Sequence, residues 1–164
     1  MNPLSMKDGD FETALEKMRA YCSYSERCNS EVFLRLGKFM LTTNEKNRII
    51  ELLEEEGFLN SKRYLSVFVR GKLIHNHWGK IKIKYELRAK GFSDNEINDA
   101  LATIDQDEYN LLVKKLISNL KTQKAVGGDL SRKEKEKVIR AMMAKGFEYD
   151  LIRTYFTEEL DIDN

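Results

Sequence analysis

Three short motifs, each a serine or threonine followed three residues later by a glutamate, constrain the fold of this chain most strongly. They are Thr42–Glu45, Ser93–Glu96 and Ser131–Glu134. In such a capping box, the hydroxyl and the carboxylate satisfy backbone N–H groups that are free at the start of a helix. Apolar residues follow each box at spacings of three and four, as on the buried face of an α-helix. One proline and nine glycines are too few for the many turns of a β-sandwich, so we predict an all-α fold.

Single cap and stop residues mark the other helix boundaries. Expected caps are Asp10, Ser25 and Asn60. Expected stops are Gly57, Gly91 and Gly146. With the apolar stripes, these signals predict nine helices. The first ends near residue 22, the second near residue 40, the seventh covers roughly 107–124 before a break at Val126–Gly127, and the ninth carries apolar residues as far as Leu160.

The segment Lys80–Tyr85 alternates lysine with an apolar residue, which taken alone predicts a β-strand. Two observations favour a helix instead. Ile83 and Leu87 are four residues apart, as are Ile81 and Tyr85, and Gly91 supplies a helical stop. We therefore predict a helix that begins at Trp78–Gly79.

This helix and the helix that follows it are repeated, with a constant shift of 55 residues, as the last two helices of the chain. The shift maps Ile83 to Val138, Leu87 to Met142, Gly91–Phe92 to Gly146–Phe147, Ile97 to Ile152 and Leu101 to Phe156. A unit of about fifty residues buries little alone, so neighbouring units must pack together. We predict three tandem three-helix repeats in an elongated, curved body. After a flexible lead at 1–9, the repeats cover 10–58, 59–105 and 106–164, the last with a short acidic tail.

The stretch Lys62–Lys90 concentrates positive charge in a chain whose formal net charge is only +1. It contains nine basic residues and a single acid, Glu86, and glutamates and aspartates crowd both of its flanks. Such segregation steers association with a polyanion or an acidic protein surface. The alternative is that the stretch forms only a solvated lysine face beside buried aromatics. If the stretch binds a partner, the candidate binding residues are Lys62, Arg63, Arg70, Lys72, Lys80, Lys82, Lys84 and Arg88.

Spacing and ring chemistry refine this set. Lys80, Lys84 and Arg88 follow one another at intervals of four, so on a helix they form one charged ridge, and Lys82 points elsewhere. Three aromatics of the stretch, Tyr64, Phe68 and Trp78, are expected in the core rather than as exposed stacking platforms.

Little in the sequence indicates an enzyme, a metal site or a membrane protein. His75 and His77 lack a further ligand at usable spacing, Cys22 and Cys28 lack a second pair, and no glycine-rich phosphate loop is present. No apolar run approaches the roughly 18 residues of a membrane span, and the N-terminus lacks the apolar core of a signal peptide. We expect a cytoplasmic protein with no catalytic residue, metal or cofactor, and with reduced, core or half-buried cysteines.

The segment from Gly57 to Leu87 resembles the RecX family, the regulators of RecA recombinase. The resemblance rests on the segments 57–64 (GFLNSKRY), 68–72 (FVRGK) and 78–83 (WGKIKI), followed by Glu86–Leu87. The spacing from Ser25 through Glu31–Val32 to Leu36 also resembles the motif of the family's first unit.

This resemblance implies three tandem three-helix repeats and a protein that lies in the groove of the RecA–DNA filament. We expect this protein to be a monomer and a non-enzymatic regulator. There it is expected to restrain recombinase, ATPase and co-protease activity in DNA repair, homologous recombination and the SOS response. Weak contact with single- or double-stranded DNA is compatible with this role. The alternative is a helical protein that binds DNA or RNA directly and acts independently of RecA.

Overall fold

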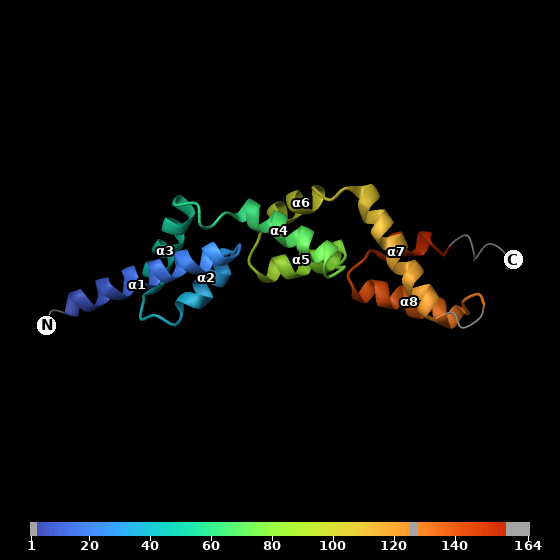
Figure 1. The fold of residues 1–164 in the computed structure, drawn as a ribbon, viewed down its shortest axis with the longest axis horizontal. Helices are drawn as coiled ribbons and strands as arrows, with labels where there is room; N and C mark the ends of the chain where they lie inside the picture. Colours follow the sequence, from blue (N-terminus) through green and yellow to red (C-terminus); the bar gives the residue numbers. More distant parts are fainter. Residues whose placement is uncertain (1–2, 125–127, 157–164) are drawn as a thin grey trace. The chain divides into compact units, whose positions relative to one another are not determined.

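A computed structural model describes the backbone of residues 3–124 and 128–156, and the side chains of residues 10–123 and 128–156. Within these residues the structure is all-helical, which confirms the predicted fold class (Figure 1). The helices are α1 (Pro3–Tyr24), α2 (Asn29–Leu36), α3 (Thr43–Glu55), α4 (Ser61–Ile74), α5 (Lys80–Ala89), α6 (Asp94–Ala102), α7 (Gln106–Lys124), α8 (Arg132–Ala144) and α9 (Tyr149–Thr154). The residues Val126, Gly127 and Leu160 and the predicted acidic tail lie outside the described residues.

All three predicted capping boxes are present, at the starts of α3, α6 and α8. The predicted cap Asn60 is also confirmed, because its side-chain oxygen accepts a 2.9 Å hydrogen bond from the Arg63 backbone N–H. A fourth box starts α2, where Cys28 is the cap and its backbone N–H donates to the Glu31 carboxylate at 3.0 Å. Cysteine is not among the preferred cap residues, so this box was not predicted from the residue pattern.

Two of the predicted caps are wrong. α1 begins at Pro3, so Asp10 lies within the helix. Proline suits the first helical position because its missing N–H has no partner there in any case. α2 begins at Asn29 rather than after Ser25, and it ends at Leu36, short of the predicted end near residue 40. The Cys28 box therefore sets the start of α2.

The chain divides into two compact units, 1–68 and 69–164, with the boundary inside α4. The first unit packs α1, α2 and α3 around a core that includes Met18, Val32 and Leu53. The second unit contains a core from α7, α8 and α9, centred on Tyr109, Met142 and Phe156. The division into repeats at 10–58, 59–105 and 106–164, with a lead at 1–9, stays a prediction.

The shift of 55 residues relates two turns with the same geometry. Gly91 and Gly146 have φ values of 93° and 88°, a left-handed backbone that strongly favours glycine. The next residue closes each turn in the same way: the Phe92 N–H donates to the Leu87 carbonyl at 3.2 Å, and the Phe147 N–H donates to the Met142 carbonyl at 3.2 Å. The repeat seen in the sequence is therefore a repeat of local structure.

Candidate functional site

The eight predicted binding residues lie on two consecutive helices. Lys62, Arg63, Arg70 and Lys72 belong to α4, and Lys80, Lys82, Lys84 and Arg88 belong to α5. Only Lys62, Arg63, Arg70 and Arg88 are exposed, and the other four are half-buried. The structure therefore separates cations that face solvent from cations that take part in packing.

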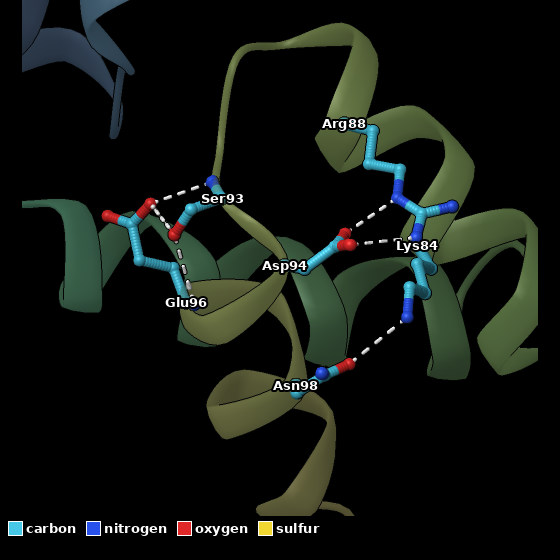
Figure 2. Close-up of polar contacts among 6 residues, drawn as sticks. All are labelled: Lys84, Arg88, Ser93, Asp94, Glu96 and Asn98. Carbon is cyan, nitrogen blue, oxygen red and sulfur yellow. Dashed lines mark hydrogen bonds and ion pairs between the residues drawn. The ribbon is translucent and has the colours of Figure 1, made fainter.

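Two residues of the ridge on α5, Lys84 and Arg88, lie against α6 (Figure 2). Arg88 donates two hydrogen bonds to the Asp94 carboxylate, from Nε at 2.7 Å and from a terminal nitrogen at 3.1 Å. One turn earlier, Lys84 Nζ donates to the Asn98 side-chain oxygen at 3.2 Å. The pairing raises the Arg88 pKa and lowers the Asp94 pKa, in both cases mainly through the side-chain hydrogen bond. The charge of Arg88 is thus partly compensated within the fold.

Lys80, the first residue of the ridge, joins α5 to α7. Its Nζ donates to the Gln106 side-chain oxygen at 3.0 Å and lies 4.4 Å from the centre of the Tyr109 ring. Its backbone N–H donates to the Tyr109 hydroxyl at 3.1 Å, and that hydroxyl donates to the Glu148 carboxylate at 2.6 Å. Tyr109 is fully buried, and burial followed by the bond to Glu148 raises its pKa. Lys80 therefore has a structural role.

Trp78 was expected in the core, but its side chain is only half-buried and lies beneath two lysines. The Nζ atoms of Lys72 and Lys82 lie 4.7 and 4.4 Å from the centre of its indole ring. Such cation–π contacts hold the ammonium groups near a flat apolar surface. Lys82 also departs from the ridge, as predicted. The other two aromatics expected in the core, Tyr64 and Phe68, are buried and half-buried, and their rings stack at 5.8 Å.

Arg63 is exposed but engaged with its own unit. It pairs with the Glu26 carboxylate and donates to the carbonyls of Gly57 and Phe58 at 3.1 and 3.4 Å. By contrast, Lys62 and Arg70 are exposed on α4 and make no ion pair with any of the side chains that the structure describes. These two residues are the predicted candidates most available to a partner.

The sequence did not reveal how the start of α5 is docked. The Gly79 N–H donates to the Lys145 carbonyl at 2.8 Å, and the Ile81 N–H donates to the Gly146 carbonyl at 3.0 Å. With the Lys80 bond to Tyr109, three N–H groups that an isolated helix leaves free are satisfied by the turn after α8 and by α7. Gly79 and Gly146 allow this approach, because a Cβ on either would overlap the facing segment. The only signal in the sequence is the pair of glycines.

Histidine and cysteine add no ligand cluster to this surface. His77 has a φ of 52°, which is uncommon for a residue other than glycine. Cys22 and Cys28 are free and buried, and burial raises the Cys22 pKa to about 11. Across the described residues, no three His, Cys, Asp or Glu side chains are grouped so that they could hold a metal. No helix in the same residues is long and apolar enough to cross a membrane.

Comparison with protein families matches two consecutive segments of the chain. Residues 61–101 match the second three-helix domain of RecX, and residues 111–156 match its third three-helix domain. Together these segments make up more than half of the chain. The chain belongs to the RecX family. All eight predicted binding residues lie within the segment that matches the second RecX domain.

Similar proteins and structures agree with this assignment to RecX. Regulatory protein RecX from Lactococcus lactis subsp. lactis strain IL1403 is 30% identical over 145 residues, which is 87% of this chain and 53% of the relative. Regulatory protein RecX from Clostridium botulinum strain Eklund 17B is 33% identical over 121 residues, or 71% of this chain and 54% of the relative. The chain thus spans about half the length of the curated relatives that it matches.

Solved RecX structures have the same fold. The crystal structure of RecX from Lactobacillus salivarius matches with a TM-score of 0.80 at 27% identity, over 94% of this chain and 99% of that one. A second crystal structure of a regulatory protein RecX matches with a TM-score of 0.78 over 91% of this chain and 74% of that one, and its 23% identity shows the fold alone.

Proposed function

We propose that this RecX-family chain binds the RecA–DNA filament and restrains RecA without catalysing a reaction. The observation that carries the proposal is the match of residues 61–101 to the second RecX domain, since this segment holds all the candidate cations. In this account the chain acts as a monomer, limits filament growth or favours disassembly, and thereby lowers recombinase, ATPase and co-protease activity.

The contacts within the fold rank the candidate residues. Lys62 and Arg70 are exposed and unpaired among the described side chains, so an acidic protein surface or a phosphate can reach them without breaking an existing bond. Arg88 and Lys84 must first leave Asp94 and Asn98, which lowers the net gain from a new partner. The charges on α4 therefore supply the first contacts, and those on α5 add to them.

Filament binding by a charge-reversed variant tests this ranking. RecA filaments assembled on immobilised single-stranded DNA with a slowly hydrolysed ATP analogue would be titrated with fluorescently labelled protein. We expect the double variant Lys62→Glu/Arg70→Glu to bind at least about tenfold more weakly, because charge-assisted contacts contribute about 1.5–3 kcal/mol each. The matched control is Lys114→Glu/Lys115→Glu, which makes the same charge change on the exposed face of α7.

If the two double variants lost affinity for the filament equally, net charge alone would explain the loss, and the role of α4 would be contradicted. Binding to bare DNA with the same affinity as to the filament would favour the alternative, a nucleic-acid-binding protein that acts without RecA. A gain in affinity that requires RecA on the DNA would support the proposal.

A further inference from the structure

A pocket in the first unit gathers positive charge and aromatic rings outside the basic stretch. It has a volume of about 470 Å³ and lies between α1, α2 and the residues that follow α2. Its lining includes three cations, two aromatic rings and a methionine, and no acidic side chain: Lys17, Met18, Tyr21, Arg35, Lys38 and Phe39. We refer to it as the Tyr21 pocket.

The cations at the Tyr21 pocket rest on aromatic rings. The guanidinium carbons of Arg27 and Arg35 lie 4.0 and 4.4 Å from the centre of the Tyr21 ring, and Lys17 Nζ lies 5.7 Å from the centre of Phe39. Stacking occupies the flat face of a guanidinium and leaves the N–H donors at its edge available. Arg35, which lines the pocket, is thus held in place with donors that can bind an anion in a bidentate manner, whereas Arg27 lies outside the lining and donates from Nε to the Tyr21 carbonyl at 3.5 Å.

Nearby carboxylates do not neutralise these cations, because they are engaged elsewhere in the first unit. Glu16 and Glu56 pair with Arg19, Glu26 pairs with Arg63, Glu51 and Glu55 pair with Arg48, and Glu31 and Glu45 cap helices. Within residues 10–123 and 128–156, no ion pair involves the pocket cations Lys17, Arg35 and Lys38. Their charge is therefore available to an anionic ligand.

We infer that the Tyr21 pocket binds a nucleotide of a single-stranded nucleic acid, with the phosphate on Arg35 and Lys38. Proteins that bind single strands combine a positive groove with aromatic side chains, as this pocket does. Its volume exceeds what a lone phosphate needs and falls in the range of sites that enclose a small organic ligand. A base or sugar can then contact the half-buried ring of Phe39. The carboxylates of an acidic peptide satisfy the cations but leave this ring uncovered.

This site is separate from the cations of α4 and α5, and its test contains no RecA. Binding of the full chain to a fluorescein-labelled 20-nucleotide oligo-dT would be followed by anisotropy at several salt concentrations. We expect Arg35→Glu/Lys38→Glu to lower the affinity about tenfold or more. The loss of two phosphate contacts should also reduce the slope of log affinity against log salt by about 1.4. The control Lys114→Glu/Lys115→Glu, with the same change in net charge, should change the affinity less than about twofold.

Circular dichroism would establish that each variant is folded. Arg35→Gln/Lys38→Gln, which adds no negative charge, replaces the glutamate variant if that variant unfolds, and it should give a smaller loss in the same direction. Three results would overturn the inference: no binding of oligo-dT by the wild type, equal losses in the pocket variant and its control, or competition by polyglutamate as effective as competition by unlabelled oligo-dT.

Discussion

Replacement of Gly146 by alanine should break the contact between the start of α5 and the turn after α8. A Cβ on Gly146 would lie 2.5 Å from the Lys82 backbone nitrogen and would also overlap the Lys82 Cβ. The Lys82 backbone cannot rotate away as a flexible side-chain end could, so the two segments must separate. This separation removes the hydrogen bonds that the N–H groups of Gly79 and Ile81 make to the turn, and it strains the bond from Lys80 to Tyr109.

Gly91 supplies a matched control for the backbone cost of this substitution. It occupies the equivalent turn with a φ of 93°, against 88° for Gly146, and a Cβ on Gly91 would meet nothing within 4 Å. We expect Gly91→Ala to lower the free energy of unfolding by about 1 kcal/mol, since left-handed strain of about 1–2 kcal/mol is partly offset by a less flexible unfolded chain. Gly146→Ala should lose a further 2–4 kcal/mol or so, because a hydrogen bond contributes about 0.5–1.5 kcal/mol net.

Urea unfolding followed by the fluorescence of Trp78 would measure this difference. Trp78 is the only tryptophan of the chain and directly precedes Gly79, so its emission reports on the docked segment. A difference of about 2–4 kcal/mol corresponds to a shift of the urea midpoint by about 1–2 M at a typical slope. Equal destabilisation by Gly91→Ala and Gly146→Ala would refute the argument from close backbone approach.

Three further substitutions test individual contacts. Trp78→Ala should lower the free energy of unfolding, measured with a chemical denaturant, by about 1–3 kcal/mol, which is less than the loss expected for a fully buried tryptophan, and Trp78→Phe should retain part of this stability. Arg63→Ala should cost about 1–2 kcal/mol in thermal melts, whereas loss of the Glu26 pair alone should cost less, because Arg63 also bonds two carbonyls. Ser93→Ala should cost about 1 kcal/mol near pH 7. The backbone and hydroxyl of Ser93 lower the Glu96 pKa, so this difference should shrink as the pH falls through that pKa and the carboxylate is protonated. A pH-independent difference would contradict this account.

Local signals in the sequence were sufficient for most of the fold. The serine and threonine capping boxes placed the starts of α3, α6 and α8, and glycines placed the ends of α3, α5 and α8. For α5, helical spacing correctly outweighed the alternation of lysine and apolar residues. Ile83 and Leu87 are buried, while the other pair, Ile81 and Tyr85, lies on the exposed face. Spacing identifies a helix face, but only tertiary packing decides which face is buried.

The candidate site could be predicted only as a set of charges. Sequence spacing placed Lys80, Lys84 and Arg88 on one ridge, but their partners come from α6 and from the first turn of α7. The positions of those partners depend on the geometry of the turns between helices, which residue spacing along the sequence does not specify. The Tyr21 pocket was missed for a related reason, since its three cations are spread over residues 17–38 and come together only when α1, α2 and the residues after α2 pack.

RecA's ATP hydrolysis on single-stranded DNA, with this protein added at a small fraction of the RecA concentration, tests the proposed function most directly. The account predicts a progressive fall in the rate of hydrolysis, because a few bound molecules that block growth or favour disassembly affect many RecA protomers. The Lys62→Glu/Arg70→Glu variant should require a higher concentration for the same fall. An unchanged rate, with circular dichroism showing a folded protein, would contradict the proposed restraint of RecA.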